Sequence, residues 1–142
     1  MNKRLTLEDD RLKRNYINKI NMERQKKFII VKDWDEFYNI RFGYVFYHKD
    51  LMYESDKKDH IECIGGGKWE FDYNNKTITL YGSSDDFGRP KKKDIQKALK
   101  GMNKKLVFGH LSWTLEFMYE DEFPDRDYSD LDKYTIIIDY KD

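Results

Sequence analysis

Residues 61–88 read IECIGGGKWEFDYNNKTITLYGSSDDFG, and this stretch decides the fold that the sequence predicts. Three consecutive glycines, Gly65–Gly67, lie near its start, and Gly82 and Gly88 bound a polar loop at its end. Glycine has no Cβ, so it permits turns and the close approach of a backbone to another group. We therefore expect a segment whose two ends both lie close to another part of the protein or to a ligand.

The middle of this stretch has the pattern of a β-hairpin. Asn74 and Asn75 both tolerate positive φ, which favours a two-residue turn. The register set by this turn places Tyr73 opposite Lys76, Phe71 opposite Ile78 and Trp69 opposite Leu80. The apolar partners then share one face, because side chains alternate between the two faces of a sheet. Lys68 points to the opposite face, beside the glycines.

The composition indicates one folded domain. A chain of 142 residues is long enough to bury a core, and 16% aromatic residues argue against disorder. The formal net charge of zero suggests neither a nucleic-acid partner nor an anionic membrane surface. Cys63 is the single cysteine, which excludes an intramolecular disulfide and a cysteine zinc cluster. With no apolar run of membrane-spanning length, we expect a cytoplasmic protein, with a monomer favoured.

The rest of the chain predicts three parts. Residues 1–25 form a helical extension, whose apolar stripe either lies on the domain or belongs to an arm for a partner or nucleic acid. Residues 26–115 form the main domain. Residues 116–142 are an acidic connection followed by a C-terminal strand, which we expect to join an edge of the same sheet.

Further elements follow from apolar patterns along the chain. We expect strands over 27–31, 41–47, 106–115 and 134–140, a turn of helix over 33–39, a short helix over 48–55, and a helix that begins at Pro90 and extends to about Gly101. In the short helix, Leu51 and Met52 should point inward. Pro90 suits a first helical position because it lacks the N–H that a helix leaves unpaired there.

Two segments have the residue types of an anion site. Gly65–Gly67 match neither a P-loop nor GxGxxG, so they form either a bulge or a nest of N–H groups for an anion. Ser83 and Ser84 stand in the glycine-bounded loop before a helix, where amides and hydroxyls can hold phosphate. Lys91–Lys93 at that helix start either accompany a bound anion or are solvated.

The histidines have no metal-ligand spacing, so no metal or other cofactor is expected. His48 stands between a predicted strand and a predicted helix, where scaffolds present catalytic groups, although an ordinary packing histidine fits the same pattern. Cys63 has no activating neighbour in the sequence and reads as a packing residue.

Three ordered motifs give the chain a family resemblance. They are Tyr47-His48-x-Asp50-Leu51, then Glu62-Cys63-Ile64-Gly65-Gly66-Gly67-Lys68, then Tyr81-Gly82-x-Ser84-x-x-Phe87-Gly88. The chain resembles the phosphohistidine phosphatase family, also called Janus/Ocnus, over roughly residues 26–109. This resemblance implies an α+β fold with a mixed β-sheet and helices packed on both faces. It also implies metal-independent hydrolysis of a phosphoramidate, chiefly protein phosphohistidine.

The resemblance implies a role for particular residues. His48 matches the catalytic histidine of the family, and it would act as general base. The positions that match phosphate-binding groups or basic residues near the site are Lys27, Arg41, Lys68, Ser84 and the backbone N–H of Asp86. Lys68 replaces an arginine of the family pattern and so loses a bidentate fork. Arg41 matches only if a one-residue gap is allowed.

Asp85 and Asp86 depart from the expected anion loop, because two carboxylates there oppose a bound dianion. This departure keeps three functions open. The first is a phosphatase acting on a phosphohistidine protein or a small phosphoramidate. The second is a catalytically inactive module that binds phosphorylated or basic partners. The third is an interaction protein that acts through its basic N-terminal and acidic C-terminal segments.

Overall fold

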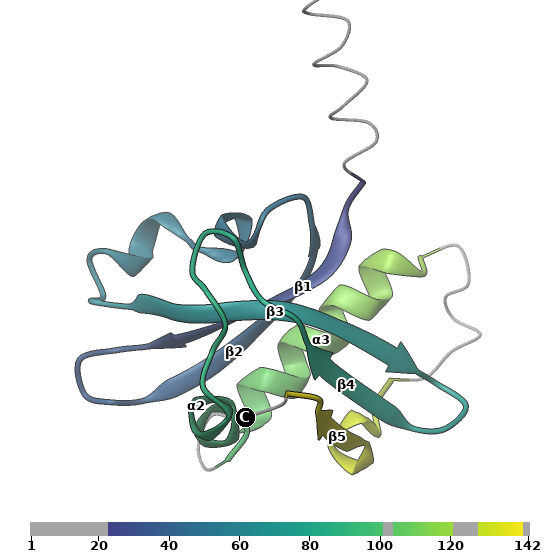
Figure 1. Cartoon of the computed structure of the whole chain (residues 1–142). Coiled ribbons are helices and arrows are strands. Elements are labelled where there is room, and N and C mark those ends of the chain that lie inside the picture. The colour runs from purple at the N-terminus through teal and green to yellow at the C-terminus, as the bar shows by residue number, and fades with distance from the viewer. Residues whose placement is uncertain (1–22, 101–103, 121–127, 141–142) are drawn as a thin grey trace, which may run out of the picture.

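The computed structural model describes residues 23–100, 104–120 and 128–140, and Figure 1 shows one sheet with helices around it. The sheet has the strand order β2-β1-β3-β4-β5. The strands are β1 (Gln25–Lys32), β2 (Tyr38–Val45), β3 (Glu62–Asp72), β4 (Thr77–Tyr81) and β5 (Thr135–Ile138). The described helices are the 3-10 helices η1 (His48–Leu51), η2 (Glu54–Asp56) and η4 (Leu131–Lys133), and the α-helices α2 (Lys92–Ala98) and α3 (Lys104–Met118).

The sheet is mixed, as predicted. Its neighbouring strands are antiparallel except β4 and β5, which run parallel. β5 lies at one edge, where the C-terminal strand was expected. The predicted N-terminal helix, residues 1–25, falls almost wholly outside the described residues, and Gln25 at its end belongs to β1.

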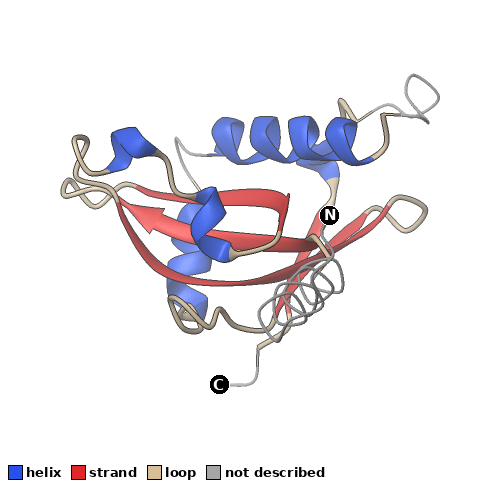
Figure 2. Ribbon diagram, turned by 90° about the horizontal axis from the view of Figure 1, so that it is seen from above, coloured by secondary structure: helices blue, strands red, loops and turns tan. Residues whose placement is uncertain are grey.

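Helices cover both faces of the sheet, which confirms the α+β class. Phe28 and Ile30 of β1 pack in the core cluster that includes buried residues of α2 and α3. Ile29 and Val31 point the other way and pack against Leu51 of η1. The two α-helices and η4 therefore lie on one face, where α3 forms the long helix beside the sheet in Figure 2, and η1 and η2 lie on the other.

The hairpin register is confirmed for its apolar pairs, whereas its turn differs. Trp69 lies opposite Leu80 and Phe71 opposite Ile78. The ladder ends before residues 73–76, and the positive φ falls on Lys76 rather than on the asparagines. The reason is the carboxylate of Asp72, which accepts hydrogen bonds from the backbone and side-chain N–H groups of the second asparagine. These bonds stabilise a longer loop that ends in a left-handed residue.

The strand predicted over 106–115 is wrong, because this segment belongs to α3. Its buried residues, Val107, Leu111, Thr114 and Leu115, follow the helical spacing of three and four rather than the alternation of a strand. The helix protects the outer edge of β2. His110 Nδ1 accepts the N–H of Phe42 at 3.0 Å, and the Thr114 hydroxyl donates to the carbonyl of Phe42 at 3.1 Å.

The turn of helix predicted over 33–39 is also wrong. The Asp33 carboxylate accepts the backbone N–H of Phe37 at 3.0 Å, and Glu36 adopts a positive φ of 66°. A tight reverse turn results, and β2 begins directly after it at Tyr38. The aspartate thus caps its own turn, which competes with a helix.

Close packing explains the three glycines of β3. They pair with β1 directly beside a bulge between Ile30 and Val31, so the bulge is the alternative that the structure bears out. A Cβ on Gly65 would lie 2.6 Å from the Cα of Pro90, and one on Gly67 would lie 2.4 Å from the carbonyl oxygen of Tyr81. Pro90 therefore packs against β3, and α2 begins later than predicted, at Lys92.

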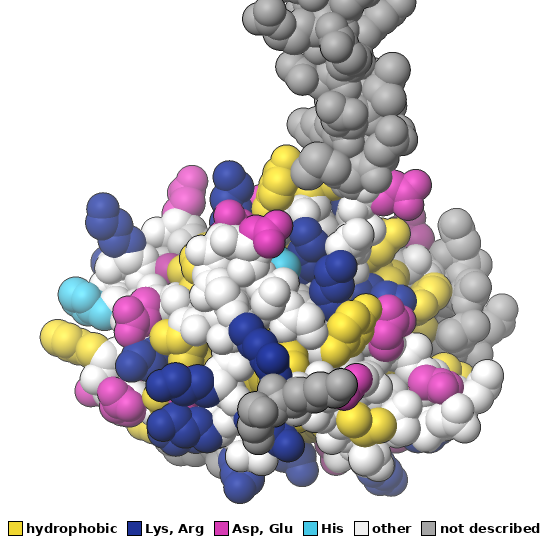
Figure 3. Space-filling view, in the orientation of Figure 1, with side chains coloured by type: hydrophobic (Ala, Val, Ile, Leu, Met, Phe, Trp, Pro, Cys, Tyr) yellow, Lys and Arg dark blue, Asp and Glu magenta, His cyan; other side chains and the backbone are white. Residues whose placement is uncertain are grey.

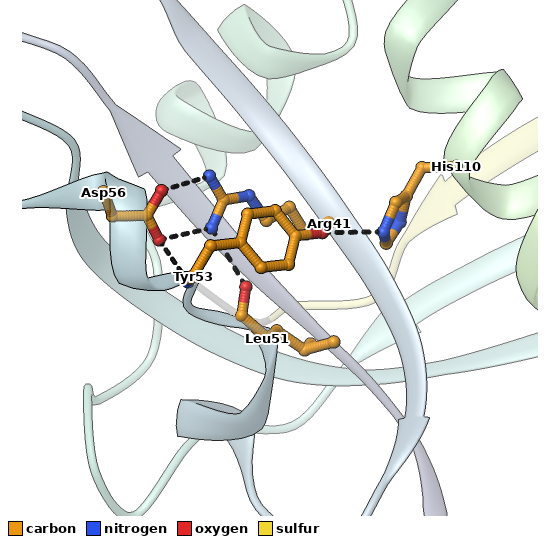
Figure 4. A network of polar contacts seen from close by, with 5 residues as sticks. All are labelled: Arg41, Leu51, Tyr53, Asp56 and His110. Atoms are coloured by element: carbon orange, nitrogen blue, oxygen red, sulfur yellow. Dashed lines mark hydrogen bonds and ion pairs between the residues drawn. The ribbon is translucent and has the colours of Figure 1, made fainter. Parts of the chain in front are cut away.

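A buried ion pair fixes the 3-10 turns to β2 (Figure 4). The guanidinium of Arg41 makes two hydrogen bonds of 2.8 Å to the Asp56 carboxylate, and the two side chains are only 9% and 5% exposed. The same guanidinium donates to the carbonyl of Leu51 at 2.9 Å and lies 4.1 Å from the centre of the Tyr53 ring. The Tyr53 hydroxyl in turn lies 3.1 Å from His110 Nε2. The 48–56 segment is thereby tied to β2 and to α3.

Two glycine substitutions should have opposite effects on stability. Gly67→Ala places a methyl group against backbone and ring atoms that cannot move aside, so we expect a loss of about 1–3 kcal/mol or more in the free energy of unfolding. Gly109→Ala in α3 meets nothing within 4 Å and should gain roughly 0.5–1 kcal/mol. Urea unfolding followed by circular dichroism measures both. Equal midpoints for the two variants would contradict the packing described above.

Asp56→Asn should destabilise the protein by about 3–5 kcal/mol at neutral pH, because it leaves the buried Arg41 without its counter-charge. The hydrogen bonds from Arg41 lower the pKa of Asp56 below its ordinary value of 3.8. The ion pair therefore contributes fully above pH 3.8, and its contribution is lost as the pH falls through the lowered pKa. Urea unfolding at neutral and acidic pH should show a smaller acid loss in Asp56→Asn than in the wild type. The exposed Asp35→Asn variant serves as the control. If acidification lowered the free energy of unfolding equally in all three proteins, the stabilising role of the Arg41–Asp56 ion pair would be refuted.

Candidate functional site

The residues of the candidate site come from four places in the fold. β1 supplies Lys27, η1 supplies His48, β3 supplies Lys68, and the loop between β4 and α2 supplies Ser84. Lys27 and Lys68 are directly opposite each other in the β1–β3 ladder, so their side chains share a face. Four of the residues singled out in the sequence thus gather at one place on the sheet.

His48 is held in one tautomer by β3. Its side chain is buried, with 6% of the residue exposed, and Nε2 lies 2.8 Å from the carbonyl oxygen of Gly67. A carbonyl oxygen only accepts hydrogen bonds, so the neutral ring carries its proton on Nε2. Nδ1 then keeps its lone pair, and it has no hydrogen-bond partner among the described residues. His48 is therefore arranged to accept a proton at Nδ1.

The charges around His48 favour its neutral form. Burial lowers the pKa of His48 below the ordinary value of 6.5, and the charge of Lys27 lowers it further. The bond to Gly67 and the carboxylates of Asp86 and Asp85 act in the opposite direction and raise this pKa. Because the net shift is downward, the imidazole is neutral at pH 7 and able to act as a base.

Local bonds shape the turn that carries His48. The Asp50 carboxylate accepts the N–H of Tyr47 at 2.9 Å, and the N–H of Asp50 donates to the carbonyl of Tyr47 at 3.0 Å. The first bond is the N3 half of a capping box, and the second is the backbone bond of the 3-10 turn that starts η1 at His48. The family motif included Asp50, but the sequence did not reveal this role.

The loop bounded by Gly82 and Gly88 is closed on itself by Ser84. Both glycines have positive φ, at 76° and 77°. The buried Ser84 Oγ accepts the N–H groups of Asp86 at 3.2 Å and Phe87 at 3.1 Å, so the predicted anion-binding amide of Asp86 donates to this hydroxyl in the structure. The Ser84 hydroxyl proton remains available to an acceptor.

Gly66 brings the loop and the histidine together. Its N–H donates to the carbonyl of Gly88 at 3.0 Å, which fixes the loop to β3. A Cβ at Gly66 would lie 2.8 Å from His48 Cδ2 and 3.2 Å from Ser84 Cβ. The absence of a side chain at this position is therefore what lets His48 and Ser84 lie against the same point of the strand.

Lys27 lies among carboxylates and beside Lys68. The Nζ of Lys27 donates to the carbonyl of Phe46. Burial lowers the pKa of Lys27, and the neighbouring Lys68 lowers it further, whereas Asp50, Asp85 and Asp86 raise it. In the space-filling view, basic side chains lie beside a patch of histidine surface near the centre of the face, and acidic side chains lie above it (Figure 3). The site thus combines cations suited to an anion with carboxylates that oppose one.

Arg41 lies apart from this group. Its guanidinium is bonded to Asp56 and to the Leu51 carbonyl, and it reaches the site only through η1, the turn that also carries His48. Arg41, which was predicted as a phosphate contact, therefore holds in place the turn that carries His48. No pattern in the sequence signals this pairing, since Asp56 stands in a charged run that is typical of a solvated segment.

Lys91–Lys93 lie at the start of α2, where the sequence leaves a bound anion and solvation as alternatives. Lys91 and Lys93 are exposed and Lys92 is partly buried at the start of the short helix α2. No group of three or more His, Cys, Asp or Glu side chains in ranges 23–100, 104–120 and 128–140 is arranged to hold a metal ion. No described helix combines the length and the hydropathy that crossing a bilayer requires.

Comparison with known proteins supplies the family. No curated protein sequence matches the chain significantly. The model of the Janus/Ocnus family matches residues 16–106, which is more than half of the chain and includes all the residues gathered at the site. The matched range contains the His48 turn, the glycine strand with Lys68 and the Ser84 loop. The chain belongs to the Janus/Ocnus family.

Proposed function

We propose that the chain is a metal-independent phosphatase that hydrolyses phosphoramidate bonds, chiefly those of phosphohistidine in proteins. One observation carries the proposal: His48 donates through Nε2 to the Gly67 carbonyl, which leaves Nδ1 as a base near Lys27, the ladder partner of Lys68. Membership of the Janus/Ocnus family is consistent with it. A phosphoramidate P–N bond is labile, so positioning of the phosphoryl group and control of one proton suffice.

The proton moves through His48 in this proposal. A water molecule attacks phosphorus, a P–O bond forms, and Nδ1 of His48 takes a proton from the water. The P–N bond breaks, and the departing nitrogen takes a proton from the imidazolium or from solvent. The products are inorganic phosphate and the free amine or imidazole, and His48 is neutral again. The Gly67 carbonyl also stabilises the transient imidazolium through its bond to Nε2.

The phosphoryl oxygens would be held by the remaining site residues. Lys27 and Lys68 supply positive charge from one face of the sheet, and the Ser84 hydroxyl supplies a donor from the loop. The Asp86 N–H can join them if an anion replaces its bond to Ser84. Loss of one such donor typically costs about 2–4 kcal/mol in the barrier. Lys68 contributes a point charge rather than the bidentate contact of an arginine.

His48→Ala should abolish hydrolysis of a phosphohistidine peptide while the fold survives, because no other described histidine lies at the site. Release of inorganic phosphate measures turnover, and circular dichroism checks the fold. His60→Ala, which removes an exposed histidine stacked on Trp34, is the matched control and should keep full activity. Treatment with a chelator should leave the wild-type rate unchanged. Equal rates for wild type and His48→Ala would refute the proposal.

The double variant Asp85→Asn, Asp86→Asn should bind phosphate more tightly and shift the pH profile. A carboxylate at ~6 Å opposes a dianion by nearly 3 kcal/mol per unit charge at an effective dielectric of ~20, and exposure to solvent reduces this, so we expect a fall of a few-fold to about ten-fold in KM. Both carboxylates raise the pKa of His48. Their removal lowers that pKa, so the acid limb of kcat/KM should move to lower pH. An unmoved limb would contradict the assignment of His48 as the base.

The same two carboxylates favour a second candidate function, an inactive module that binds a phosphorylated or basic partner on this fold. Among the described residues, neither Asp85 nor Asp86 has an ion-pair partner within 4.0 Å, so both charges act on any bound anion. Wild-type protein that binds a phosphohistidine peptide and never releases phosphate would establish this function in place of hydrolysis.

A further inference from the structure

A groove of about 430 Å³ lies beside the candidate site, on the other side of η1. Its walls are the end of β2, the 48–53 segment and α3, and they are largely aromatic, with Phe46, Tyr53, Trp113 and Phe117 among them. The volume falls within the range of protein pockets that bind small ligands or large side chains. None of the functions argued above uses this groove.

The aromatic side chains of the groove are unusually exposed. Trp113 is 64% exposed, Tyr53 48% and Phe117 46%. Trp113 and Phe117 stack with ring centres 6.1 Å apart, and Arg24 lies 5.5 Å from the centre of the Phe46 ring and 5.8 Å from that of Phe117. Apolar side chains that are scattered singly over a surface need no explanation, whereas a contiguous group marks a binding surface.

The groove is continuous with the candidate site through two residues. The carbonyl of Phe46 accepts the Nζ of Lys27, while the side chain of the same residue belongs to the groove. Asp50 lines the groove, and its charge acts on Lys27. η1 therefore has His48 on one side and Asp50 with Leu51 on the other. A ligand bound at the site reaches the groove by crossing one short turn.

We propose that this groove is a substrate subsite that holds an aliphatic or aromatic side chain flanking the phosphorylated residue of a protein substrate. The inference rests on the proposed phosphatase function. An extended peptide advances roughly 3.3 Å per residue, so a side chain a few positions from the phosphorylated one spans the turn. The apolar walls match an apolar side chain. Arg24 and Asp50 carry opposite charges at the groove, which favours neither a strongly acidic nor a strongly basic occupant.

The test compares a peptide with a substrate too small to reach the groove. The substrates are a phosphohistidine peptide with leucines flanking the phosphorylated residue, the same peptide with serines in their place, and phosphoramidate itself. For each protein, kcat/KM on the leucine peptide is divided by kcat/KM on phosphoramidate. Trp113→Ala with Phe117→Ala should lower this ratio about ten-fold, mainly through KM, and should remove the preference for leucine over serine. Leu106→Ala, which truncates a 61% exposed residue of the same helix outside the groove, is the matched control and should keep the wild-type ratio.

A binding measurement gives a second readout. With His48→Ala, which prevents turnover, the leucine peptide should shift the indole N–H resonance of Trp113 and leave that of Trp34 unchanged, because Trp34 is exposed at a different place, against His60. An unchanged ratio or an unshifted Trp113 resonance would overturn the subsite while turnover by the wild type upholds the phosphatase. Turnover of neither substrate would overturn the phosphatase, and with it the subsite. A dimer that is lost in the double variant would assign the groove to a contact between two copies and also overturn the subsite.

Discussion

The packing of β3 against η1 at Gly66 and Gly67 is the contact on which the candidate site depends. Gly66 has no side chain, so the His48 ring and Ser84 both rest against the strand where a Cβ would lie 2.8 and 3.2 Å from them. The next residue supplies the carbonyl that holds Nε2 of that ring at 2.8 Å. One glycine therefore provides the space and its neighbour provides the acceptor. Because the acceptor is a backbone atom of a central strand, the tautomer of His48 is set by the fold itself rather than by a second side chain that could rotate away.

Electrostatics at the site follow from this same packing. Burial against β3 lowers the pKa of His48, and Lys27 on the adjacent strand acts in the same direction. Asp85 and Asp86 oppose both effects from the loop. A base works best when its pKa lies near the working pH, so carboxylates that raise a pKa depressed by burial bring His48 back toward that range. In the proposed phosphatase, the cost of the carboxylates to dianion binding would thus be linked to a benefit for proton transfer.

The sequence predicted the features that depend on short-range pattern and on the family motifs. Alternation placed Trp69 opposite Leu80, and the motifs named His48, Lys68 and Ser84, which the fold brings together with Lys27. Prediction from the sequence failed where contacts between residues distant in the chain determine the structure. The segment 106–115 reads as a strand from its composition, yet it is a helix whose buried residues fit the face next to β2. Arg41 finds Asp56 fifteen positions away, and Phe42 finds His110 sixty-eight positions away. No local pattern signals such pairs.

η1 joins the candidate site, the buried ion pair and the aromatic groove, because each of its sides contacts a different neighbour. His48 is bonded to β3, the carbonyl of Leu51 is held by the buried guanidinium of Arg41, and Asp50 lies at the aromatic groove. A 3-10 helix this short has little internal hydrogen bonding, so its position is determined by these outside contacts. A side chain that enters the groove therefore touches the same turn that holds His48. In the proposed phosphatase, binding of the substrate flank and placement of His48 would then depend on one short segment, which a small phosphoramidate contacts only at the site itself.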